Sequence, residues 1–135
     1  MTLDRRFVPQ RDLERTGFTA HLHGMAGEVP GLLAIAFCDE EGEIIDYHTY
    51  LDPFDTKLLG AVLGVLLSTV QREGPRLSAG GIRELVLLTD RYLVFARRTA
   101  AEYFLAGLMA PDAVLGKLLE ALDRLEARLL GEAGI

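Results

Sequence analysis

Apolar residues lie in short blocks along the chain, and residues that favour turns separate the blocks. Some blocks are short and continuous or rich in β-branched residues, as in strands, and these are 32–38, 43–50, 82–88, 92–98 and 102–109. Others have helical spacing, weak in the first and clear in the last, and these are 11–25, 54–72 and 111–131. The predicted order is therefore helix, two strands, helix, three strands, helix.

Turn-forming residues fix where these elements end. Gly42 follows three acidic residues, and a glycine in a left-handed conformation suits a tight hairpin between the first two strands. Asp52 or Asp55 can cap the central helix, and Gly74 with the following proline ends it. The boundaries predict short connections, which favour pairing between strands that follow one another along the chain.

These elements predict an α+β fold with a five-stranded, largely antiparallel sheet. The central helix is expected on one face of the sheet and the two terminal helices on the other. Residues 11–131 are expected to form one domain, because this length supports a single core. Residues 1–10 mix charges with a proline and are expected to form a loose tail.

The helix at 54–72 has more apolar residues than one sheet face can cover. Its leucines and valines extend well beyond an ordinary amphipathic stripe. Only a narrow strip is small or polar, and it contains Lys57, Gly60, Gly64, Ser68 and Gln71. The strip either faces solvent or admits another backbone. Each exposed leucine or valine forfeits roughly 1.5–3 kcal/mol, so a second copy of the chain is the expected cover.

The strand at 82–88 is the second element that needs a partner. If it lies at the sheet edge, its free backbone groups require pairing or protection. Two copies meeting antiparallel there would form one continuous sheet with their central helices side by side. The contact residues predicted for this homodimer are Leu59, Gly60, Leu63, Gly64, Leu67, Arg83, Glu84, Leu85, Val86 and Leu87.

Charge and composition narrow the possible partners. The net charge of −6 disfavours nucleic acid and anionic membrane surfaces, which need clustered basic residues. The apolar stretch at 58–67 is about half the ~20 residues of a membrane-spanning helix, and no apolar block follows the N-terminus as in a signal peptide. One cysteine, Cys38, excludes an internal disulfide. We therefore expect a cytoplasmic protein without membrane insertion.

Residues suited to catalysis or metal binding are few. His21 and His23 lie two positions apart on a predicted helix and so face different directions, and His48 lies on a strand. We expect ordinary surface or partly buried histidines, and Cys38 as a small buried residue. The acidic cluster at 39–46 lacks the ligand order of a calcium loop, and no phosphate-binding glycine motif occurs. No catalytic residue, metal or cofactor is predicted.

Several segments in series resemble the roadblock/dynein light-chain family, particularly its bacterial MglB-like members. Glu28-Val29-Pro30-Gly31 leads into LLAIAFCDEEGEIID, which resembles the family's proline-glycine turn, strand, D-x-x-G turn and strand. The helix FDTKLLGAVLGVLLSTVQ, the strand pair IRELVLLTDRYLVFARR and the segment EYFLAGLMAPDAVLGKLLEALDRL continue the likeness. The resemblance covers roughly residues 11–130, and no single motif carries it alone.

The resemblance implies a profilin-like domain that homodimerises through its second helix and third strand. It also implies a regulator or scaffold for a Ras-like small GTPase, without a cofactor or catalytic residues of its own. Arg97 and Arg98 end a strand and are expected mainly as an exposed pair, with partner contact as the alternative. Two other functions stay open: an assembly subunit without a GTPase partner, and a small-ligand sensor with a closed apolar cavity.

Overall fold

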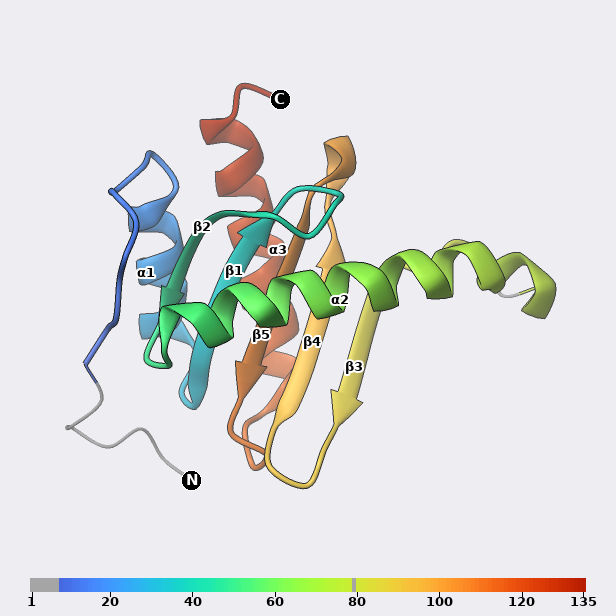
Figure 1. Ribbon diagram of the computed structural model, residues 1–135, viewed down its shortest axis with the longest axis horizontal. Helices are drawn as coiled ribbons and strands as arrows, with labels where there is room; N and C mark the ends of the chain where they lie inside the picture. Colours follow the sequence, from blue (N-terminus) through green and yellow to red (C-terminus); the bar gives the residue numbers. More distant parts are fainter. Residues whose placement is uncertain (1–7, 79) are drawn as a thin grey trace.

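The computed structural model describes residues 8–78 and 80–135. Along the chain it contains α1 (Thr19–Glu28), β1 (Leu32–Cys38), β2 (Ile44–Thr49), α2 (Pro53–Glu73), the 3-10 helix η1 (Gly74–Leu77), β3 (Glu84–Leu88), β4 (Leu93–Arg98), the 3-10 helix η2 (Ala100–Glu102), β5 (Phe104–Met109) and α3 (Leu115–Glu132). The strands form one antiparallel sheet in the order β2-β1-β5-β4-β3 (Figure 1). The predicted α+β class and antiparallel sheet are confirmed.

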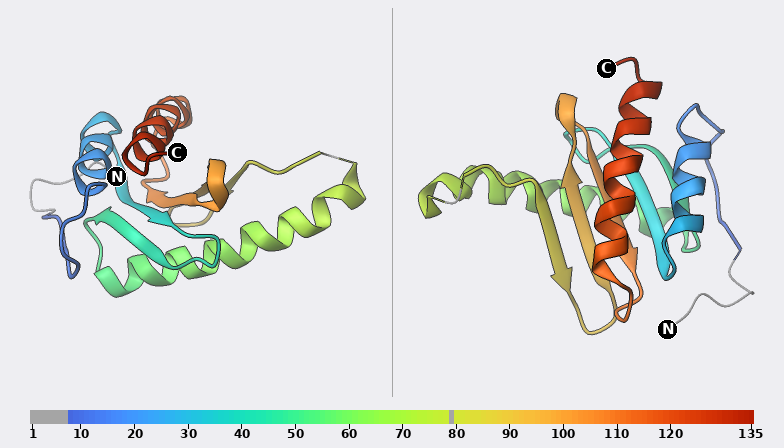
Figure 2. Two further views of the ribbon diagram at one scale, coloured as in Figure 1. Left: turned by 90° about the horizontal axis from the view of Figure 1, so that it is seen from above. Right: turned by 180° about the vertical axis from the view of Figure 1, so that it is seen from behind.

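Helices cover both faces of this sheet. Helix α2 crosses one face from β2 towards β3, and α1 and α3 lie side by side on the other (Figures 1 and 2). The predicted division of helices between the two faces is therefore confirmed. It leaves β2 and β3 as the two edges of the sheet.

The two faces carry side chains of different size. The face under α1 and α3 is packed with large residues, including Leu22, Phe37 and the α3 leucines 118, 122 and 125. On the face under α2, Ala36, Ala106 and Ala96 are register partners on neighbouring strands. Because alanines occupy the middle of this face, a helix can lie close to the backbone of the sheet.

Helix α1 begins at Thr19, not near Arg11 as predicted. The residues before it make side-chain hydrogen bonds to the fully buried Asp46 of β2. Arg11 contributes an ion pair with an Nη2–Oδ1 distance of 2.7 Å, and the hydroxyls of Thr16 and Thr19 donate to the other carboxylate oxygen. Such side-chain bonds compete with helix formation, so the helix starts only at Thr19, the last residue of this network.

The buried carboxylate of Asp46 is kept ionised by its partners. Burial alone would raise the pKa of Asp46, but hydrogen bonds from Thr16, Thr19 and Arg11 outweigh burial and lower it. The predicted tail at 1–10 lies mostly outside the described residues. Gln10, at its end, forms an antiparallel bridge with Thr49. The chain before α1 is thus attached to the outer edge of β2.

Other boundaries shift by a few residues. The last helix starts at Leu115, whereas proline placement predicts a start near Pro111. The N–H of Ala110 donates to Gly31 at 2.9 Å and its carbonyl accepts from Ala113, so residues 110–113 form a turn instead of the first helical turn. The cap of α2 is as predicted: the side chain of Asp52 accepts from the N–H of Phe54.

The segment Pro53–Leu77 is long and apolar enough to cross a membrane by length and composition, with a mean hydropathy of 1.3. This segment is longer than the apolar stretch at 58–67 that the sequence alone suggested. One face of α2 is packed against the sheet, with Leu63 and Leu67 buried there. The composition of α2 therefore fits a core helix whose second face is not covered by any of the residues described.

A histidine pair joins α1 to β2. The Nδ1 atoms of His23 and His48 lie 3.4 Å apart, and the ring of His48 stands edge-on to Tyr50. His48 is buried, and its Nε2 atom has no hydrogen-bond partner among the described residues. Burial, with smaller contributions from His23 and Arg11, lowers the pKa of His48 to about 4.

We predict that His48 makes the fold sensitive to mild acid. Its folded pKa, about 4, lies below the ordinary value of 6.5, so the unfolded chain takes up the proton first as the pH falls. Between pH 7 and pH 4 the wild-type chain should lose about 2–3 kcal/mol more unfolding free energy than His48→Gln. Urea unfolding at several pH values measures this difference. Parallel pH profiles for the two proteins would contradict the prediction.

Candidate interaction surface

The strip of small residues on α2 faces the chain's own sheet. Gly60 and Gly64 are buried, and the turn between β1 and β2 lies directly against them. A Cβ atom at Gly64 would lie 3.0 Å from the Cα of Gly42, and one at Gly60 would lie 3.1 Å from the Sγ of Cys38. The backbone that this strip admits is therefore that of the chain's own hairpin. Gly42 has φ = +86°, the conformation predicted for this turn.

This packing changes the α2 part of the predicted dimer contacts. Gly60, Leu63, Gly64 and Leu67 are already buried within a single chain, because the glycines and the alanine row bring this face of α2 down onto the sheet. They are not available to a second copy. Of the predicted α2 contacts only Leu59, which is partly buried, lies beside the exposed surface.

The opposite face of α2 is apolar and exposed. Leu58, Val62, Val65 and Leu66 keep 51%, 49%, 67% and 38% of their surface accessible, and Phe54 at the start of the helix keeps 70%. These residues follow one another at helical spacing along the side turned away from the sheet. Within the part of a single copy that the structure describes, α2 is therefore covered on one side only.

The edge strand β3 also exposes apolar residues: Val86, Leu87 and Leu88 are 42%, 40% and 74% exposed. Leu85 and Leu87 lie on the α2 side of the sheet, with Leu85 partly buried against the core there, whereas Val86 and Leu88 lie on the α3 side, where Val86 is the register partner of Phe95. The far end of α2 and the following η1 project beyond β3, the last strand of the sheet (Figures 1 and 2). We refer to the exposed apolar residues of α2 and β3 together as the α2/β3 surface.

Strand β3 also has backbone groups that point away from the sheet. The N–H of Arg98 donates to the carbonyl of Arg83 at 2.8 Å, and the N–H of Thr89 donates to the carbonyl of Tyr92 at 2.8 Å. The backbone N–H and C=O groups of the odd-numbered residues on this strand therefore point towards β4. Backbone direction alternates along an antiparallel strand. The N–H and C=O groups at 84, 86 and 88 therefore point outward.

The other edge of the sheet, at β2, is occupied by the chain's own N-terminal segment. The carbonyl of Thr49 accepts from the N–H of Gln10 at 2.8 Å, and the carbonyl of Tyr47 accepts from Arg11 at 3.0 Å. The N–H of Tyr47 donates to the side chain of Asp46 at 2.7 Å. The two edges are thus chemically different: β2 is protected, and β3 is open.

Arg97 and Arg98 have separate environments, so the expected exposed pair is wrong for Arg97. Arg97 is only 5% exposed, and its guanidinium forms ion pairs with Glu84 of β3 and with Asp123 and Glu126 of α3. It points to the α3 face and joins the edge strand to that helix. Arg98 points to the opposite face and is exposed.

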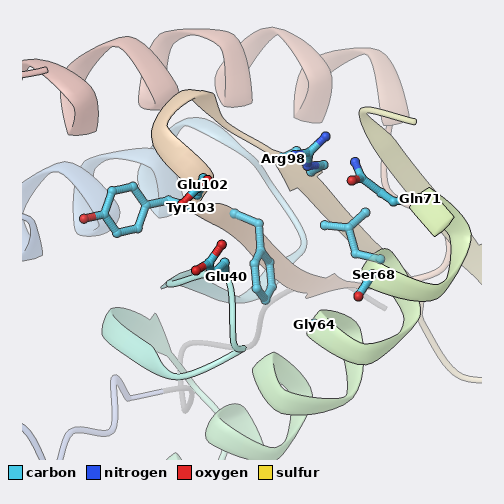
Figure 3. A pocket seen from close by; sticks show the side chains of 9 residues that line it. Glu40, Gly64, Ser68, Gln71, Arg98, Glu102 and Tyr103 are labelled. Atoms are coloured by element: carbon cyan, nitrogen blue, oxygen red, sulfur yellow. The ribbon is translucent and has the colours of Figure 1, made fainter. Parts of the chain in front are cut away.

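Arg98 lines an open pocket of about 200 Å³ beside α2. Figure 3 shows Arg98 and Gln71 on one side and Glu40 and Glu102 on the other. The neighbouring Glu102 raises the pKa of Glu40, because two carboxylates in contact disfavour a second negative charge. The charged rim differs from the apolar cavity expected of a small-ligand sensor.

The remaining chemical candidates lie apart from one another. His21 faces Glu132 of α3 at 3.6 Å, whereas His23 faces His48, so the two histidines point in different directions as predicted. Cys38 is buried, and burial raises the pKa of its thiol to about 12. Within residues 8–78 and 80–135, no three histidine, cysteine or acidic side chains lie close enough to hold a metal ion.

Comparison with known proteins identifies the fold. No family model and no curated protein sequence matches this chain. The roadblock/LC7 domain of Streptomyces avermitilis superposes with a TM-score of 0.78 at 21% identity, over 86% of this chain and 97% of that one. The chain therefore has the roadblock/LC7 fold, in agreement with the resemblance in its sequence.

Two MglB structures show the same likeness over almost the whole chain. The gliding protein MglB of Thermus thermophilus gives a TM-score of 0.77 at 17% identity, covering 98% of each chain. An MglB with a tetrameric arrangement gives 0.78 at 17% identity, also covering 98% of each chain. The structure is thus MglB-like in fold.

We predict that Gly64→Ala lowers the free energy of unfolding by about 1–3 kcal/mol, because the new methyl group meets the backbone of Gly42 at 3.0 Å. Gly24→Ala is the matched control, since a Cβ there has no atom within 4 Å. The control should gain roughly 0.5–1 kcal/mol from helix propensity. Chemical unfolding measures both, and equal gains at the two positions would refute the close contact.

Proposed function

We propose that this protein is a homodimeric regulator or scaffold that binds a Ras-like small GTPase. The observation that carries the dimer is the α2/β3 surface, where an exposed apolar helix face adjoins an open strand edge. The partner at this surface is a second copy of the chain, paired through β3 with the two α2 helices alongside. The contact residues on β3 are those predicted from the sequence, and those on α2 are the exposed neighbours of the buried glycine face.

Burial supports self-association. Covering three side chains such as Val62, Leu66 and Val86 is worth roughly 1.5–3 kcal/mol each. Isolated exposed leucines are common on proteins, but a continuous apolar helix face beside an open strand is typical of an interface. The protected β2 edge supports the same conclusion, because it leaves β3 as the edge to which another strand can be added.

The GTPase part of the proposal rests on the family resemblance and on the MglB-like fold. We infer that the protein acts by holding or ordering its partner and contributes no reacting group of its own. Arg98, exposed beside α2, is a candidate partner contact, whereas Arg97 is committed to its ion pairs. A cytoplasmic location accompanies this proposal, since such partners are cytoplasmic.

An assembly subunit without a GTPase partner is the second candidate. The tetrameric arrangement of one MglB of the same fold favours it. The two candidates share the dimer and differ in whether nucleotide state matters. Pull-down with the purified protein against Ras-like GTPases of the same cell, loaded with GTP or GDP, separates them. Retention that depends on the nucleotide supports the regulator, and no retention of either form contradicts it.

We predict that Val86→Lys and Leu66→Glu reduce the solution mass from about two copies to one 14.8 kDa chain. Each substitution places a charge at the proposed contact, where it would be buried without a partner. Both positions are exposed in the single chain, so circular dichroism should show an intact fold. Light scattering after size exclusion measures the mass.

Val114→Lys is the control for this experiment. Val114 is 60% exposed and precedes α3, outside both α2 and β3, so the same change in charge should leave the mass unaltered. A wild-type protein that is monomeric at micromolar concentration would contradict the proposed dimer. A dimer that survives both α2/β3 substitutions would place the contact elsewhere.

A further inference from the structure

The proposed homodimer leaves open how the two β3 strands align. A two-fold axis between antiparallel copies of a five-residue strand can pass through Leu85, Val86 or Leu87 while retaining substantial overlap. Each choice shifts every cross-strand pair by two residues. Hydrogen-bond direction and charge distinguish the three alignments.

We propose that the axis passes through Val86, so that Val86 pairs with the partner's Val86 and Glu84 pairs with the partner's Leu88. This inference rests on the proposed self-association and goes beyond it by stating which residue of the partner strand pairs with each residue of β3. The interface is then one continuous antiparallel sheet with the residue pairs fixed about Val86.

Backbone direction favours this alignment. The groups at 84, 86 and 88 point outward, as the bonds from Arg98 to Arg83 and from Thr89 to Tyr92 show. With Val86 on the axis, every outward residue of the strand faces an outward residue of the partner, and each such pair exchanges two hydrogen bonds. With Leu85 or Leu87 on the axis, one outward residue of each β3 strand loses its partner within the strand.

The structure also limits a shift towards Leu85. That alignment places Leu88 opposite the partner's Ile82, which lies two residues before β3. The carbonyl of Ile82 already accepts a hydrogen bond from the side chain of Gln71 on α2, at 3.0 Å. Pairing there would have to displace a contact that ties α2 to the start of β3.

Charge disfavours a shift towards Leu87. That alignment moves Glu84 beyond the partner's β3 to the β3–β4 turn, where it meets the like-charged Asp90, and the two-fold axis repeats this contact. With Val86 on the axis, Leu85 instead faces the partner's Leu87 under α2. Arg83 then lies opposite the partner's Thr89, so no like charges face each other.

An isotope-filtered NOE experiment on the wild-type dimer tests the alignment without mutation. Dimers are mixed from labelled and unlabelled protein, so that only contacts between copies are recorded. With Val86 on the axis, Leu85 and the partner's Leu87 form a non-hydrogen-bonded pair with Cα atoms about 4.5 Å apart, and their Hα protons should give a strong NOE. An Hα contact of Leu85 with its own equivalent, or of Leu87 with its own equivalent, would overturn the proposal.

Cysteine variants provide a second measurement. Nitroxide labels on Glu84→Cys and Leu88→Cys should give equal distances between copies, each about 14 Å between Cα atoms, because both positions lie two residues from the axis. An axis at Leu85 or Leu87 would make them unequal, about 8 Å and about 20 Å. The native Cys38 does not interfere, because it is buried and its thiol pKa is about 12.

The outcomes separate this inference from the proposal it rests on. A dimer with the Leu85–Leu87 contact and equal label distances supports the alignment. A dimer in which Leu85 contacts the partner's Leu85, or Leu87 contacts the partner's Leu87, overturns the alignment and keeps the homodimer. Unequal distances between the spin labels have the same meaning. A monomer, or a dimer in which the amides of 84, 86 and 88 exchange as freely as in a monomeric variant, overturns both.

Discussion

The close contact between α2 and the β1–β2 turn determines which side of the helix faces outward. Alanines in the middle of the sheet face and glycines on the helix allow the two backbones to approach, with Gly64 against Gly42. Once that face is committed, the leucines and valines on the opposite side have nothing to cover them among the residues described. The exposed apolar face of α2 is thus a consequence of how this helix packs inside one chain.

The same contact explains what the sequence could and could not predict. The order of elements, the antiparallel sheet and the division of helices followed from hydrophobic spacing and turn residues. The sequence also indicated that α2 is too apolar for one sheet face. The direction of the glycine strip did not follow, because small residues suit a solvent face, a partner's backbone or the chain's own hairpin equally well. Only the position of Gly42 in space decides among these.

Long-range polar contacts were also beyond sequence reasoning. Arg97 was expected at the surface, yet it lies between an edge strand and a helix that are far apart in sequence, with carboxylates from both. The N-terminal segment was expected to be helical from Arg11, yet its polar residues bind Asp46 instead. In both cases a charged residue is paired with a partner more than ten positions away, which no local pattern reveals.

The difference between the two sheet edges has a consequence for aggregation. A sheet that grows by joining strand edges needs a receptive strand at each new end. In the proposed dimer, the composite sheet would terminate at both ends in β2, whose carbonyls at Thr49 and Tyr47 already accept hydrogen bonds from Gln10 and Arg11. Growth would then stop after one step, because two residues that precede the first helix protect the remaining edges against further strand addition.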